Sequence, residues 1–327
     1  MTWNLRNPQQ EKEALLKEAE VLEAQVDSMR AQAGIASLAV SESIKQTEWQ
    51  NRVMEQTRRE QLLSLHGTRS VLSQHLRAQF SVPVNIPIRL GTDPVQRRQE
   101  LLSSSRLKLD TAYRFLEERF RGVDGQQRYQ DREMWTSPEG DFCVASSDLM
   151  LFHGVKSVKQ VFDALQFYLV NMEISISEVL GQLTIREDID SIDTLVSNHR
   201  LISSTDYGIV VEVNSATFSE YFEKFADHND EEFALLTSDF VTEDELFPYC
   251  PQERVRKNIS GTVSLRPLRS PSNSGELVVV MRRAAFLSIE KPQFPVSDAA
   301  LADLEYNVGS WGDVMIKSMR DVLYTSK

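Results

Sequence analysis

The strongest structural signal in the sequence is a long amphipathic stretch near the C-terminus, from Ser297 to Leu323. Its apolar residues recur at steps of three and four, which places them on one face of an α-helix: Leu301, Leu304, Val308, Trp311, Met315, Met319 and Val322. Ser297 suits the N-cap. Gly309 and Gly312 interrupt the helix beside Trp311 and let a bulky group approach its backbone. We expect the upstream chain to form a curved β-sheet around this helix, whose stripe is either a ligand-facing wall or the ordinary buried face of a docked helix.

The size and charge of the chain indicate about two soluble units. The sequence has 327 residues and a formal net charge of −12, and the acidic excess lies after residue 100. An acidic surface repels phosphate backbones, so nucleic-acid binding is not expected. The N-terminus lacks a signal-peptide pattern and no apolar stretch approaches the length of a membrane span. We therefore expect an intracellular protein, cytoplasmic or nuclear.

The first 80 residues carry a helical pattern with a short heptad repeat. Leu15, Leu22 and Met29 recur every seven residues between Pro8 and Ala33. This spacing suits a coiled coil and a homodimer through residues 8–33, although the same helix could also pack back on the body. A second helical segment follows from about 43 to 80. Residues 81–95, with three prolines and a glycine, read as a linker to a domain at 96–327.

The order of elements after the linker predicts the fold class. A helix over 95–120 precedes three short strands at 129–135, 142–146 and 149–153. A helical segment over 157–180, broken near Asn171, precedes strands at 183–187, 200–204, 208–214, 233–241, 258–268 and 276–287. With the last helix, this order predicts an α+β helix-grip architecture, in which a curved antiparallel sheet wraps a long C-terminal helix.

Six short stretches support a closer comparison: 161–165 (VFDAL), 186–188 (RED), 214–218 (NSATF), 239–249 (DFVTEDELFPY), 254–257 (RVRK) and 311–315 (WGDVM). Together with the layout, they resemble the oomycete family of START-like (lipid-transfer-like) proteins that carry a bZIP-like segment ahead of the domain. The resemblance covers roughly residues 97–325. The chain departs from that family before the heptads, because residues 1–14 contain only the cations Arg6 and Lys12. A DNA-reading basic helix needs more positive charge on one face.

The resemblance implies a hydrophobic cavity under the C-terminal helix that binds a lipid or another apolar molecule, and it leaves transient membrane contact open. Our candidate ligand-binding residues are apolar wall positions together with three charged ones: Phe162, Leu165, Arg186, Glu187, Val211, Glu212, Val263, Val308, Trp311 and Met315. Arg186 would bind an acidic head group through its guanidinium, or it would form a structural ion pair, for example with Glu212.

The sequence contains none of the common catalytic signatures, such as a nucleophile elbow, a phosphate-binding loop, a dinucleotide fingerprint or a zinc-protease motif. Neither its histidines nor its cysteines have the spacing of metal ligands. We therefore expect a protein without a catalytic residue, cofactor or metal. The alternative function is a regulatory or scaffold protein, dimerised by its coiled coil, whose START-like domain mediates protein interaction; a role in transcription is one form of this alternative.

Overall fold

The computed structural model of the chain describes residues 86–191, 196–269 and 277–325, and shorter runs within 17–57. The chain divides into two compact units, Met1–Ser64 and Leu65–Lys327. In the first unit the described residues are helical, and Leu22 and Met29 expose 54% and 60% of their surface. The other heptad positions, Leu15, Ala19, Val26 and Ala33, lie outside the described residues, so the coiled coil stays a prediction.

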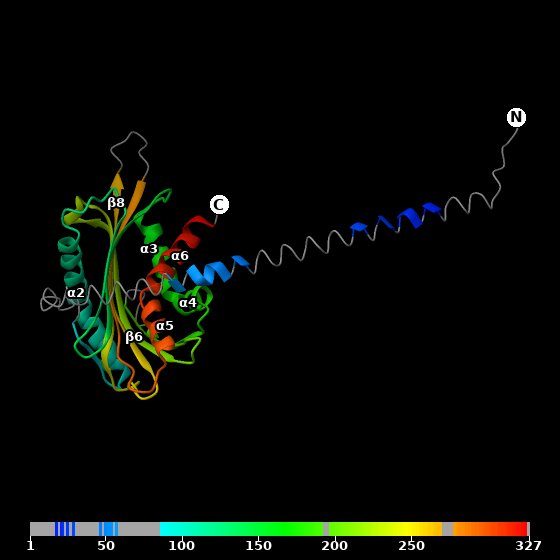
Figure 1. Cartoon of the computed structure of the whole chain (residues 1–327). Helices are drawn as coiled ribbons and strands as arrows, with labels where there is room; N and C mark the ends of the chain where they lie inside the picture. The colour runs from blue at the N-terminus through cyan, green and yellow to red at the C-terminus, as the bar shows by residue number, and fades with distance from the viewer. Residues whose placement is uncertain are drawn as a thin grey trace. The chain divides into compact units, whose positions relative to one another are not determined.

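Within the described residues, the second unit contains one strongly curved sheet of nine strands (Figure 1). The strands are β1 (Ile88–Leu90), β2 (Tyr129–Thr136), β3 (Phe142–Phe152), β4 (Thr184–Ser191), β5 (Val196–Ser204), β6 (Val210–Phe225), β7 (Glu231–Asp244), β8 (Val255–Arg269) and β9 (Leu277–Ile289). Their order is β2-β3-β9-β8-β7-β6-β5-β4, and neighbours on this path are antiparallel. β1 adds a short parallel pairing to β7.

Helices cover both faces of the sheet. α2 (Pro94–Arg119) lies on one face, whereas α3 (Val158–Val170), α4 (Met172–Leu180), α5 (Asp298–Asn307) and α6 (Ser310–Tyr324) lie on the other (Figure 1). Asp93 caps α2 by accepting from the amides of Val95 and Gln96, and Ser297 caps α5 through the amide of Ala300. No helix in the described part of the chain is long and apolar enough to cross a bilayer. A curved antiparallel sheet around a C-terminal helix is a helix-grip fold, as the sequence predicted.

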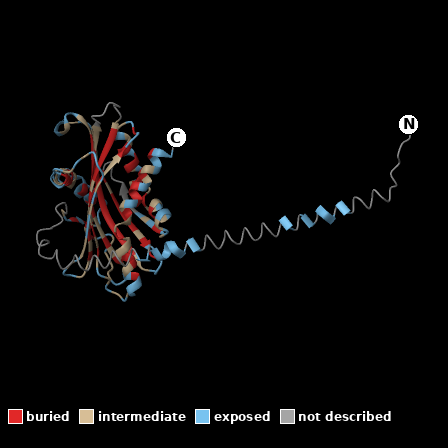
Figure 2. Ribbon diagram, turned by 45° about the horizontal axis from the view of Figure 1, so that its top comes forward, coloured by how far each residue is buried: buried red, intermediate tan, exposed pale blue. Residues whose placement is uncertain are grey.

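The buried side chains form separate cores on the two sides of the sheet, and the strands between them are the most buried part of the fold (Figure 2). One core joins α3, α4 and α6 to the sheet and includes Phe162, Leu165 and Met319. The other joins α2 to the opposite face and includes Leu116 and Phe218. Because both faces are covered, a strand can present buried residues on each side.

Several elements differ from the sequence prediction in their extent. The predicted C-terminal helix is two helices, because the chain breaks at Val308 and Gly309. The runs predicted at 142–146 and 149–153 form the single strand β3. β6 continues to Phe225, whereas the sequence predicted its end at Asn214. The prediction was too short because small hydroxyl residues, such as Ser215 and Thr217, take the place of a clear apolar alternation there, although both are buried.

The predicted linker is also partly folded. Residues 88–90 pair with β7, with Ile88 and Leu90 buried, and α2 already begins at Pro94. One of the prolines that suggested a linker, Pro94, suits its position, because it occupies the first turn of a helix, where no amide hydrogen is needed.

Candidate functional site

A cavity of about 130 Å³ lies between the concave face of the sheet and α6. The sheet provides its floor through apolar residues of β6, β7 and β8, including Val213, Leu236 and Val263. α3, α4 and α6 provide the roof through Tyr168, Leu169, Met172, Trp311 and Met315. Most of the exposed lining is apolar. A cavity with such walls suits an apolar guest more than a charged one.

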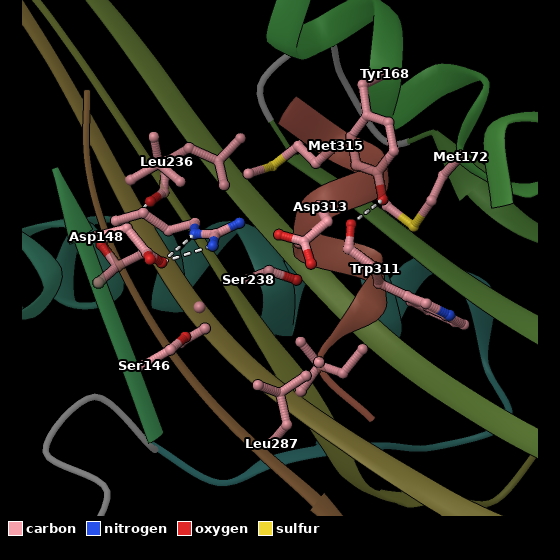
Figure 3. Close-up of a pocket in the computed structure, with 18 of the residues that line it drawn as sticks. Ser146, Asp148, Tyr168, Met172, Leu236, Ser238, Leu287, Trp311, Asp313 and Met315 are labelled. Carbon is pink, nitrogen blue, oxygen red and sulfur yellow. Dashed lines mark hydrogen bonds and ion pairs between the residues drawn. The ribbon is translucent and has the colours of Figure 1, made fainter. Parts of the chain in front are cut away.

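Tyr168 and Trp311 join the two sides of the roof. The Tyr168 hydroxyl donates to the Trp311 carbonyl at 3.4 Å, so α3 is tied to the first turn of α6. Figure 3 shows both residues with Met172 and Met315 on one side of the cavity and Ser146 and Asp148 across from them. Burial raises the pKa of the Tyr168 hydroxyl above its ordinary value, so it stays a neutral donor.

The edge of the cavity near β3 and β9 is polar. Arg283 donates to one carboxylate oxygen of Asp148 from Nε at 3.0 Å and from Nη2 at 2.6 Å. A Cβ added at Gly312 would lie 2.5 Å from Arg283 Nη1, and one added at Gly309 would lie 1.7 Å from Arg132 Nη2. The two glycines therefore make room for two guanidinium groups against the α5–α6 break. The sequence predicted that a bulky group approaches the backbone beside Trp311, and the structure places the guanidinium groups of Arg132 and Arg283 there.

His199 is the buried imidazole of the cavity wall, with 3% of its surface exposed. Its Nε2 lies 3.2 Å from the Ser215 hydroxyl, and its Nδ1 has no hydrogen-bond partner among the described groups. Burial, with a smaller contribution from the positive charge of Arg186, lowers the pKa of His199 to about 4. The ring is neutral at pH 7.

An outer groove of about 480 Å³ adjoins the cavity. Gln130, Asp148, Arg283 and Asp313 line both spaces, and α6 extends the groove outward with charged residues such as Lys317. The groove therefore gives the cavity a polar rim beside α6. This arrangement can hold the polar end of a guest while its apolar part lies under the helix.

A second, smaller pocket of about 20 Å³ lies behind Trp311, which lines both spaces. Lys257 of β8 reaches into it, with 4% of its surface exposed, and its Nζ lies 4.2 Å from the centre of the Trp311 ring. Burial lowers the pKa of this amine to about 7. Since the ordinary value is 10.5, a large part of the population carries a neutral amine at pH 7.

The structure places the predicted apolar site residues in three settings. Val263, Trp311 and Met315 line the cavity. Val211 and Val308 line the small pocket, which Trp311 also borders. Phe162 and Leu165 belong to the packed core between α3 and the sheet, where Phe162 stacks on Tyr221.

The predicted charged site residues do not line the cavity. Arg186 donates to Glu173 at 2.8 Å and to the Leu169 carbonyl at 2.7 Å, so it ties β4 to the neighbouring helices. Glu187 and Glu212 both pair with Arg200, and Glu212 also pairs with Arg254. Glu212 alternates with Val211 and Val213, which face the helices, so it points to the opposite face. The interpretation of Arg186 as a member of a structural ion pair is thus correct, but its partner is Glu173 and not Glu212.

Sequence reasoning missed several residues that border the cavity, above all Tyr168, His199, Asp148 and Arg283. Arg283 and its neighbour Arg282 stand inside a strand that is otherwise mostly apolar, and charged residues in such a strand are a signal that could have been used. His199 is next to the ion-paired Arg200 on β5, so the two side chains point to opposite faces of the sheet. If the start of β5 at Val196 had been known, this alternation would have placed His199 on the cavity side. Asp148 fell between two runs that were read as separate strands.

No family model matches the chain, and no curated protein matches it. Among solved structures, human STARD10 has 8% identity and a TM-score of 0.36, covering 63% of this chain and 78% of that one. Ara h 8.0201 has 10% identity and a TM-score of 0.26, covering 56% and 99%. The di-domain ARO/CYC BexL from the BE-7585A biosynthetic pathway has 12% identity and a TM-score of 0.27, covering 71% and 62%. The helix-grip fold of this chain rests on its own sheet order and on α6. The resemblance to oomycete proteins with a bZIP-like segment stays a prediction.

Proposed function

We propose that the protein is a non-catalytic binding protein that holds an apolar small molecule, such as a lipid, between the sheet and α6. The observation that carries this proposal is the apolar cavity itself, lined by Val263, Leu236, Trp311 and Met315 in a chain that otherwise packs both faces of its sheet. Close-packed interiors rarely leave a space much larger than a water molecule. The cavity at this position therefore supports the proposal of a site for a guest.

The volume of the cavity indicates that α6 moves when a ligand enters. Pockets for drug-sized ligands span about 300 to 1,000 Å³, which is larger than the 130 Å³ of this cavity. The break at Val308 and Gly309 separates α6 from α5 and provides a place where the chain can bend. Displacing α6 would join the cavity to the outer groove along its polar rim.

Gly261→Leu tests this proposal by filling the cavity. Gly261 lines the cavity on β8, and a Cβ added there meets no atom closer than 3.8 Å, so the first carbon of the new side chain fits without a clash. The full chain, purified without detergent, should carry a discrete extra mass in native mass spectrometry that extracts into organic solvent. We expect Gly261→Leu to remove that mass and to unfold at no lower denaturant concentration than the natural chain.

Gly125→Leu is the matched control, because its added Cβ also has room, with the nearest atom at 3.6 Å, and it lies outside the cavity. It should keep the ligand. An unliganded natural chain that also takes up nothing from a mixed lipid pool would contradict the proposal, and so would a ligand retained by Gly261→Leu.

The second candidate function is a regulatory or scaffold role, which would depend on a homodimer through residues 8–33. Leu22 and Met29 are helical, seven residues apart and exposed, which suits the seam of a coiled coil with a second helix.

Leu22→Lys should halve the mass measured by light scattering, because it places a charge in that seam. Ala24→Lys adds the same charge two residues further along the helix, off the seam, and should leave the mass unchanged. A natural chain that already has the monomer mass would exclude this function.

A further inference from the structure

The amine of Lys257 is buried in a position that packing alone does not explain. Its side chain extends from β8 on the same face as Ile259, Gly261 and Val263, toward α5 and α6. Among the described residues, no carboxylate forms an ion pair with it. Its polar surroundings are neutral groups of the small pocket, with Asp303 as the acidic residue that also lines this space. A lysine buried without a paired charge is rare, because burial penalises its ammonium form.

The same surroundings give Lys257 the properties of a nucleophile. Burial shifts the amine toward its neutral form near pH 7, and a neutral amine carries the lone pair that attacks an electrophile. The pocket of about 20 Å³ leaves space in front of it for a group about the size of one water molecule. A carbonyl group fits such a space, but a whole ligand does not.

Trp311 connects this amine to the larger cavity. The indole ring has Lys257 near one face and forms part of the cavity wall. A ligand whose apolar body lies under α6 would reach the amine by placing its terminal group past the edge of this ring. The position of Trp311, immediately after the α5–α6 break, allows it to shift with α6.

We propose that Lys257 condenses with an aldehyde or ketone group of the cavity ligand to form an imine; this inference rests on the function proposed above. The lone pair of Nζ attacks the carbonyl carbon, and proton transfer from nitrogen to oxygen gives a carbinolamine. Loss of the hydroxyl group and of the second nitrogen proton, together as water, leaves a C=N bond. No oxidant or reductant takes part. The protein would thereby hold its ligand covalently but reversibly.

Reductive trapping on the natural full chain tests this inference. The probe is butanal with sodium cyanoborohydride at pH 7, and the butyl group on each lysine is measured by peptide mass spectrometry. An ordinary lysine at pH 7 is unprotonated in only about one part in a thousand. We therefore expect Lys257 to react on the order of 10-fold faster than the exposed Lys224 and Lys317, despite its burial.

Two comparisons separate the parts of the inference. Formaldehyde is small enough for the pocket alone, so Gly261→Leu should slow the reaction of butanal at Lys257 but not that of formaldehyde. Butanal labelling of Lys257 no faster than that of Lys224 and Lys317 would overturn the imine proposal, while ligand retention in native mass spectrometry would still support non-covalent binding. Labelling by formaldehyde but not by butanal would show a reactive amine that the cavity does not serve, and would also overturn it.

Discussion

Lys108→Met should lower the free energy of unfolding by about 3 to 5 kcal/mol, which is the usual cost of removing one partner from a buried ion pair. Lys108 of α2 is fully buried and bonds Asp239 of β7 and the Ile86 carbonyl. Asp239 is equally buried and also accepts from Ser260 and from the amides of Ile86 and Phe240. Methionine keeps the length of the side chain but leaves this carboxylate without its cation. Urea unfolding followed by circular dichroism measures the loss.

The loss should depend on pH in a stated direction. Burial raises the pKa of Asp239 above 3.8, whereas Lys108 lowers it. Without Lys108 the folded pKa rises further, so the folded chain binds a proton more tightly than the unfolded chain, and stability falls as the pH rises above the unfolded value. The deficit of Lys108→Met should therefore be smaller at pH 5 than at pH 8.

A double variant supplies the control. Lys108→Met with Asp239→Asn removes the uncompensated charge while keeping one oxygen, which can accept from the Phe240 amide and the Ser260 hydroxyl, and it should recover most of the lost stability. A loss below about 1 kcal/mol for the single variant, or a double variant less stable than the single one, would show that the pair does not anchor α2 to the sheet.

The layout of this fold could be predicted because it depends on periodicity. The stripe in the C-terminal segment is buried at Leu304, Val308, Trp311, Met315 and Met319. At the ends of the stripe, Leu301 and Val322 are about one-third exposed. The spacing gives the face of each helix but not where its partner surface stops.

The polar part of the site could not be predicted because it depends on contacts between distant residues. Arg283 and Asp148 are 135 residues apart, and outside the site the same holds for Lys108 and Asp239, which are 131 apart. Their pairing follows from strand register and from the placement of α2, and neither is visible in local sequence. The wrong prediction for Glu212 has a different cause. Its position between Val211 and Val213 already indicates that it points to the face of the sheet opposite the cavity, so strict alternation would have excluded it from the candidate site.

Lys257→Met should stabilise the protein at pH 7 by about 1 to 3 kcal/mol, because it removes a buried amine that has no paired charge among the described residues. The gain is smaller than the full cost of burying the charge, since the fraction of Lys257 that stays protonated gains up to about 2 kcal/mol from the contact of Nζ with the Trp311 ring. Methionine fills nearly the same volume on β8, so the packing against Trp311 should persist.

The pH dependence identifies the amine as the cause. The pKa of Lys257 is about 7 in the folded chain and 10.5 in the unfolded one. Between these values the unfolded chain holds one more proton, so the stability of the natural chain rises with pH by about 1.4 kcal/mol per unit relative to Lys257→Met. The advantage of the variant should therefore shrink from pH 7 upward and change sign before pH 10.5. Urea unfolding at pH 7, 8 and 9 measures this difference.

Lys317→Met, at an exposed position of α6, is the control and should show neither the gain nor the slope. A constant difference between Lys257→Met and the natural chain across pH 7 to 9 would mean that the amine stays protonated in the folded state. The lone pair that imine formation requires would then be missing, so this measurement also bears on the reactivity of Lys257. A slope of the expected sign, together with selective labelling of Lys257, would show that the same neutral amine lowers the stability of the folded chain and forms the imine.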